Sequence, residues 1–189
     1  MHLNQPRIAP IDPDRASEAQ QQLLEGLAAR GRPPLNIFLT MAREPDAAQA
    51  FLAWGGYVLS ERNDLSPRLR ELAILRTGYN CGSGYEFAQH TRVGLGAGLS
   101  EGEIAAVKRP VADGEWTALE AALLTACDEL HTRQFVRDAS WAALAELGDK
   151  ARMDLVFTVG QYTQVSMLLN SFGVQLEDPA ALDPDLDHR

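Results

Sequence analysis

Apolar side chains recur at intervals of three and four residues along most of the chain, the spacing of one face of an α-helix. The pattern is clearest between residues 115 and 133, where Leu119, Leu123 and Leu130 fall on one stripe. No segment of useful length alternates apolar and polar residues as a half-buried strand does. The sequence therefore predicts an all-α protein of about seven to nine helices.

Local signals indicate where several of these helices begin or end. Pro45 and the pair Ser66–Pro67 are typical of helix starts, because a first helical turn leaves its N–H groups unpaired and proline lacks one. Leu99–Glu103 contains a capping box, in which Ser and Glu three residues apart satisfy each other's backbone N–H. Asp149 is expected to cap a last long helix, and residues 31–34 are expected to end the first.

The two ends of the chain differ from this helical body. Residues 1–16 are polar and contain three prolines, which predicts an extended arm that can lie on its own chain or on a neighbouring subunit. Residues 176–189 predict a polar tail. A length of 189 residues is typical of a single domain with a substantial core.

Charge narrows the function classes. The chain carries 17 Lys and Arg against 26 Asp and Glu, a formal net charge of −9. Nucleic acids and anionic membranes attract clustered Lys and Arg, so neither is an expected partner. No apolar run approaches the roughly 18 residues of a membrane helix, and charges near the N-terminus argue against a signal peptide. Cys81 and Cys127 match no disulfide framework, zinc site or CxxC pair, which favours a reducing cytoplasm.

The strongest candidate for chemistry is the stretch from Glu71 to His90. Glycines interrupt it once, so that it is predicted to form a helix, a loop and a second helix. Ser83, Glu86 and His90 follow the break at i, i+3 and i+7, which places all three on one face of the second helix. Glu71 lies on the preceding helix. Two acids, a hydroxyl and an imidazole can therefore converge at a helix–loop–helix corner.

The spacing of these residues, E-x11-S-x2-E-x3-H, resembles the carboxymuconolactone decarboxylase / alkylhydroperoxidase AhpD-like family. The segments LSPRLRELAILR, YEFAQH and GLSEGEI are also similar, and the resemblance covers about residues 36–174. In the peroxidase branch of the family the frame reads E-x11-C-x2-C-x3-H. Here Ser83 and Glu86 stand at the two cysteine positions, so the redox pair is missing.

The resemblance implies a compact all-α fold, a homotrimer or homohexamer, and a pocket near Glu71, Glu86 and His90, often at a subunit contact. It also favours the decarboxylase-type branch, of the kind used in aromatic catabolism. Because the family fold is described as two related helical halves, a faint echo between residues 71–79 and 154–162 can reflect a duplicated helical hairpin.

The residue types suit acid–base chemistry on a small lactone, carbonyl compound or carboxylic acid. Histidine titrates near neutral pH, and burial raises the pKa of a carboxyl toward a useful range. No cofactor is required if the substrate carbonyl accepts the electrons. Tyr79 and Ser83 can donate hydrogen bonds to a developing oxyanion, and Phe87 can line the pocket.

Two other chemistries stay open. Cys81 lies in a glycine-rich loop near a helix N-terminus, where the pKa of a thiol can fall, so an AhpD-like hydroperoxidase with peroxiredoxin-type activity is one alternative. A metal site is the other, if four side chains converge: Glu71, Glu86, His90 and His131. Because no second histidine has motif spacing, no metal is predicted.

Each residue also has a non-catalytic interpretation. Ser83 and Glu86 fit a capping box of their own, His90 can be a hydrogen-bonded structural histidine, and Glu71 is favourable at the start of a helix. A non-catalytic oligomeric binding protein that keeps the frame only for folding is therefore a third hypothesis.

Overall fold

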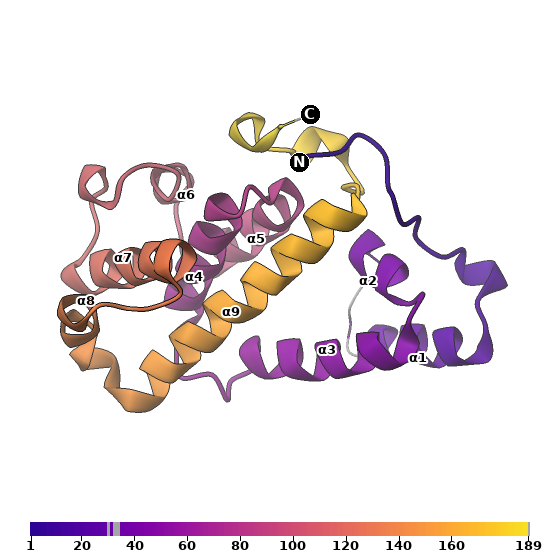
Figure 1. Ribbon diagram of the computed structural model, residues 1–189, viewed down its shortest axis with the longest axis horizontal. Helices are drawn as coiled ribbons and strands as arrows, with labels where there is room; N and C mark the ends of the chain where they lie inside the picture. Colours follow the sequence, from indigo (N-terminus) through magenta and orange to yellow (C-terminus); the bar gives the residue numbers. More distant parts are fainter. Residues whose placement is uncertain (30, 32–34, 189) are drawn as a thin grey trace.

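The computed structural model describes residues 1–29, 31 and 35–188, and the described residues contain nine α-helices and no strand (Figure 1). The prediction of an all-α fold with about seven to nine helices is thus confirmed. The helices are α1 Glu18–Ala28, α2 Asn36–Met41, α3 Pro45–Val58, α4 Pro67–Asn80, α5 Gly84–Gly96, α6 Glu101–Ala106, α7 Ala118–Arg133, α8 Asp138–Ala143 and α9 Gly148–Phe172. Residues 32–34, where the first helix was expected to end, lie outside the described part.

Most of the predicted helix starts are present. α3 begins at Pro45, Ser66 caps α4 with Pro67 as its first residue, and Ser100 forms a capping box at α6. The prediction for Asp149 is wrong, because α9 already begins at Gly148 without a side-chain cap. Asp149 instead forms an ion pair with Arg152 one turn further on.

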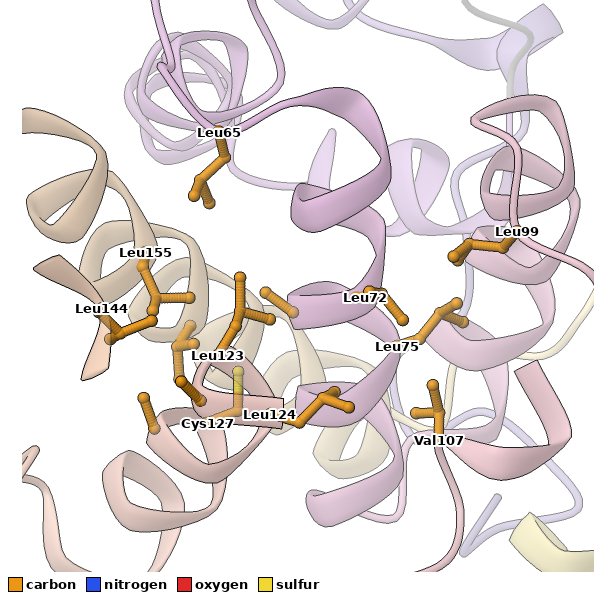
Figure 2. Close-up of a cluster of buried hydrophobic side chains, with 14 of the residues drawn as sticks. Leu65, Leu72, Leu75, Leu99, Val107, Leu123, Leu124, Cys127, Leu144 and Leu155 are labelled. Atoms are coloured by element: carbon orange, nitrogen blue, oxygen red, sulfur yellow. The ribbon is translucent and has the colours of Figure 1, made fainter. Parts of the chain in front are cut away.

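Helix α4 lies at the centre of the molecule and contacts α5, α7 and α9. Its residues 71–78 are all buried, as expected for a helix surrounded by others. Leu72 and Leu75 on α4 belong to one core cluster with Leu123 on α7 and Leu155 on α9 (Figure 2). The long helix α9 crosses the molecule beside α4 and α5 (Figure 1). Buried polar residues of α4 therefore meet side chains of α5 and α9.

The two ends of the chain are held against the body and against each other (Figure 1). The N-terminal arm lies on its own chain, where the Arg7 and Ile8 N–H groups donate to the Phe172 carbonyl. The C-terminal segment is more than a polar tail, because Leu186 is 1% exposed within the core cluster. The His188 N–H donates to the Met1 carbonyl at 2.8 Å.

None of the helices in the described part of the chain combines the length and the apolar character that crossing a membrane requires.

Candidate active site

The loop between α4 and α5 sets the geometry of the site. α4 continues through Gly78 to Asn80, and α5 begins at Gly84. Between them Gly82 has φ +61, a left-handed conformation that favours glycine. The Ser83 N–H donates to the Gly78 carbonyl at 2.8 Å and closes the turn. The break predicted from the glycines is present, and it folds α5 back along α4.

Glu71 of α4 and His90 of α5 form a close pair, with His90 Nδ1 2.7 Å from Glu71 Oε2. Glu71 is 2% exposed, so its carboxyl faces the interior. If Glu71 is ionised and the ring is neutral, Nδ1 carries the hydrogen in this pair and Nε2 is the acceptor of the ring. The His90 ring also meets Tyr162 of α9 edge-on, with ring centroids 4.9 Å apart.

Glu86 is a second buried carboxyl, 2% exposed. The Ser166 hydroxyl of α9 donates to Glu86 Oε2 at 3.0 Å, whereas Oε1 has no hydrogen-bond partner among the described residues. Burial raises the pKa of Glu86 well above 4.5, and the nearby charge of Glu71 raises it further. Glu86 therefore holds its proton at pH values where an exposed glutamate is ionised.

Glu86 and His90 line the same pocket, which has a volume of about 130 Å³. Its apolar walls come from α2, α3 and α9, and include Phe38, Phe51 and Val165. Gly55 of α3 also lines the pocket, and a Cβ at this position would lie 3.3 Å from Gln161 Nε2. The pocket thus combines an acid and an imidazole with largely apolar walls.

Two polar contributors from α9 were not predicted from the sequence. Gln161 lines the pocket with an Oε1 atom that is buried and has no hydrogen-bond partner among the described residues. Ser166 holds Glu86, as described above. Both are separated from the glutamate–histidine frame by 70 residues or more, so no local spacing connects them. The only signal was the echo that links residues 71–79 to residues 154–162.

Tyr79, Ser83 and Phe87 are not among the residues that line the pocket. Phe87 lies in the core cluster, and Tyr79 packs against that cluster. Ser83 precedes α5 but makes no side-chain capping bond, so the interpretation of Ser83 and Glu86 as a capping box is wrong. The Ser83 hydroxyl is buried with no hydrogen-bond partner in the described part of the chain.

Cys81 lies outside the pocket lining, with its Sγ 3.7 Å from His131 Nδ1. Burial raises the pKa of its thiol, and the charge of Glu86 raises it further. The expectation that this pKa falls near the helix N-terminus is therefore wrong. Cys127 is fully buried in the core cluster, and neither cysteine forms a disulfide.

The metal alternative required Glu71, Glu86, His90 and His131 to converge. Within the described residues no group of three or more His, Cys, Asp or Glu side chains is arranged to hold a metal ion. His131 instead lies beside Cys81.

Residues 45–129, from the start of α3 into α7, match the model of the carboxymuconolactone decarboxylase family. This segment, a little under half of the chain, is similar to that family and supports the resemblance seen in the sequence. The segment contains Glu71, Glu86 and His90, whereas Gln161 and Ser166 of α9 lie beyond it. The sequence matches none of the curated proteins with which it was compared.

Solved structures with the same fold include members of the AhpD group. A protein of unknown function from Agrobacterium tumefaciens, provisionally named an antioxidant defence protein AhpD, has a TM-score of 0.67 and 21% identity, and the match covers 73% of this chain and 95% of that one. The alkylhydroperoxidase AhpD core of an uncharacterized peroxidase-related protein from Ralstonia eutropha JMP134 has a TM-score of 0.68 and 18% identity, covering 92% and 93%.

A variant of the debrominase Bmp8, in complex with 2,3,4-tribromopyrrole, is similar with a TM-score of 0.75 and 16% identity, covering 94% of this chain and 96% of the debrominase. At these identities the likeness shows the fold alone. The fold of this chain is therefore one that proteins of different names share, and its chemistry has to be argued from the site.

Proposed function

We propose that this chain is a cofactor-free acid–base enzyme that acts on a small lactone, carbonyl compound or carboxylic acid. The observation that carries the proposal is the Glu71–His90 pair, 2.7 Å apart, on a pocket that is also lined by the buried Glu86. One group can take a proton and the other can supply one in the same pocket.

His90 is the proposed base. Glu71 accepts the Nδ1 hydrogen, which fixes the orientation of the ring and leaves Nε2 as the proton acceptor. Glu71 does not line the pocket but His90 does, so the opposite edge of the ring, which carries Nε2, is the edge that faces a bound molecule. Glu71 is thus a positioning residue, and it also stabilises the imidazolium formed when His90 takes a proton.

Glu86 is the proposed acid. Burial raises its pKa, so the carboxyl keeps its proton to higher pH than an exposed glutamate does, and Ser166 occupies only one of its two oxygens. The other oxygen has no partner among the described residues, so it is available to a ligand that reaches it. A neutral carboxylic acid can donate a hydrogen bond to a carbonyl oxygen as that oxygen gains negative charge.

The proposed steps balance without an added reactant. His90 Nε2 takes the proton from the carbon next to the carbonyl, and the electron pair of that C–H bond moves into an enolate. Glu86 stabilises the enolate oxygen. Return of the same proton to a different carbon moves a double bond and regenerates both groups. In a substrate that carries a β-carboxylate, loss of CO₂ yields the same enolate, which then takes a proton from water to complete the product.

An unsaturated γ-lactone such as α-angelica lactone provides a test, because it has a carbonyl, an acidic C–H bond and a movable double bond. The expected result is isomerisation and deuterium uptake in D₂O above the buffer rate, followed by NMR. His90→Ala removes the proton acceptor and is expected to return the rate to that of buffer. Glu71→Gln is expected to lower it by about 10²- to 10⁴-fold, the usual contribution of acid–base catalysis.

His131→Ala is the matched control, because this histidine lies beside Cys81 and outside the pocket lining. Turnover that survives unchanged in His90→Ala would overturn the proposal. Hydroperoxide reduction that is lost in Cys81→Ser would support the AhpD-like alternative instead. A folded wild-type protein that binds small molecules but shows neither activity would support the non-catalytic binding protein.

A further inference from the structure

We infer that the pocket accepts an uncharged single-ring compound and rejects carboxylates. This inference rests on the acid–base site proposed above, because it assigns the substrate class of that same pocket. It narrows the range of proposed substrates, since it excludes carboxylic acids that are ionised at neutral pH.

The size of the pocket limits the ligand to one ring. Its volume is about 130 Å³. An apolar cavity of about 150 Å³ in another protein is known to bind benzene. A six-membered ring with one small substituent is therefore near the upper limit, unless side chains of the walls move.

The charge around the pocket disfavours an anion. Of the described residues that line it, none is Lys or Arg. The titratable groups that line it are Glu86, His90, Tyr85 and Tyr162, and Glu71 lies directly behind His90. If His90 is protonated, the Glu71 carboxylate compensates its charge. A carboxylate ligand would thus lose its water without gaining a net positive partner.

A third carboxyl adds to this effect. Glu177 accepts hydrogen bonds from the Tyr85 hydroxyl at 2.8 Å and from Gln89 Nε2 at 2.8 Å, and both donors belong to residues that line the pocket. Glu71 and Glu177 therefore add negative charge near the same space from α4 and from the segment after α9, whereas Glu86 is the neutral acid of the proposed site. Like charges close to one another are unfavourable, so this arrangement selects against anions.

The polar groups that remain suit a neutral ligand with one hydrogen-bonding substituent. Gln161 offers a carboxamide whose Oε1 has no hydrogen-bond partner among the described residues, and a donor on the ligand would satisfy it. A carbonyl on the ligand would lie within the reach of the Glu86 acid. Benzamide has both groups on a single ring, and benzoate has nearly the same shape with a negative charge.

The test compares these two probes with the purified full-length protein at pH 7, by NMR titration of the backbone amides. The expected result is saturable binding of benzamide, with shifts around α3, α5 and α9, and binding of benzoate that is weaker by about tenfold or more. Gly55→Ala is expected to weaken benzamide binding by about fivefold, because the added methyl group takes up pocket space next to Gln161. Gly56→Ala is the matched control, since a Cβ there meets nothing within 4 Å.

Benzoate that binds as tightly as benzamide would overturn the inference. So would an absence of benzamide binding, or benzamide binding that is equal in Gly55→Ala and Gly56→Ala. This readout is separate from catalysis. A protein that prefers benzamide yet isomerises no lactone would refute the proposed reaction but support the pocket preference. Lactone turnover combined with tight benzoate binding would support the reaction and refute the pocket preference.

Discussion

The carboxyl of Glu86 lies between two helices, and its two oxygens have different surroundings. Ser166 of α9 donates to Oε2, whereas Gly78 of α4 leaves just enough space for Oε1. In the unfolded chain this group titrates near 4.5, and in the folded protein its pKa is higher. Between these two values the folded state binds more protons than the unfolded state, so the free energy of unfolding falls as the pH rises.

Glu86→Gln removes this titration and keeps the size of the side chain. The free energy of unfolding of the variant is expected to fall less steeply than that of the wild type as the pH rises from about 4.5. Urea unfolding at a series of pH values measures both slopes. Parallel pH profiles of the two proteins would show that Glu86 is not a buried, neutral acid.

Gly78→Ala tests the close contact with Glu86. The added Cβ would lie 2.9 Å from Glu86 Oε1, so the carboxyl has to move. We expect lactone turnover to fall about tenfold or more, while the free energy of unfolding changes by about 1 kcal/mol or less because alanine favours the helix. Gly96→Ala of α5 is the control, since a Cβ there meets nothing within 4 Å. Equal turnover of the two variants would contradict a catalytic role of Glu86.

At this scale the sequence predicted part of the site. Glu86 and His90 are four residues apart, and helix geometry alone is enough to place them on the same face of α5. The S-x-x-E pattern at Ser83 predicted a capping box that does not form. The Glu86 carboxyl is buried against α9 and so lies away from the turn that it would cap. Gln161 could not be found in this way, since only the tertiary fold brings α9 to the pocket.

Among the helices, α4 is held by polar contacts as well as by apolar packing. Arg76 is 7% exposed and places its Nε and one terminal nitrogen each 2.6 Å from a carboxylate oxygen of Asp128 on α7. Its other terminal nitrogen donates to the Arg109 carbonyl at 2.7 Å and to the Val107 carbonyl. One side chain thus joins α4 to α7 and to the segment after α6.

Arg76→Met is expected to lower the free energy of unfolding by about 2–3 kcal/mol, because it removes the cationic partner of the Asp128 carboxylate and the donor to two carbonyls. Arg152→Met is the control, since its partner Asp149 is 93% exposed and such pairs contribute about 1 kcal/mol or less. Urea unfolding compares them. Equal losses would mean that the Arg76 contacts add nothing beyond a surface pair.

Helix boundaries were predictable where a start signal stood alone, as at Ser66–Pro67. The long helix predicted from residue 115 begins later, because Thr117 and Glu120 form a capping box and α7 starts at Ala118. Arg76 within an apolar run gave no hint of its partners, since they lie more than 30 residues away.

In the whole molecule, the ends of the chain close one side of the bundle. A Cβ on Gly84, the first residue of α5, would lie 2.6 Å from Leu182 and 2.9 Å from the Met1 nitrogen. Such close packing at the start of α5 means that the two termini help to hold the helix that carries Glu86 and His90. A composition rich in Asp and Pro gave no sign that Leu186 would be a core residue.

Leu186→Ala is expected to lower the free energy of unfolding by about 2–4 kcal/mol, the usual loss for a buried leucine. Leu95→Ala changes the same side chain at a position that is 42% exposed and is expected to have little effect. Thermal or urea unfolding distinguishes them. A loss of less than about 0.5 kcal/mol for Leu186→Ala would show that the C-terminal segment is not part of the core.

The oligomeric state is a prediction that follows from the family resemblance. A homotrimer or homohexamer is expected, and light scattering of the purified protein measures its mass in solution. A mass of one chain, 20.7 kDa, at working concentrations would contradict it.

The proposed reaction requires a pocket that holds a protonated acid and a proton acceptor at the same pH. The most direct measurement is the carbon-13 NMR shift of the Glu86 carboxyl through a pH titration, assigned with Glu86→Gln. The expected result is a Glu86 carboxyl that is still protonated at pH 7. A Glu86 that titrates near 4.5 would be ionised at neutral pH, and the acid of the proposed reaction would be missing.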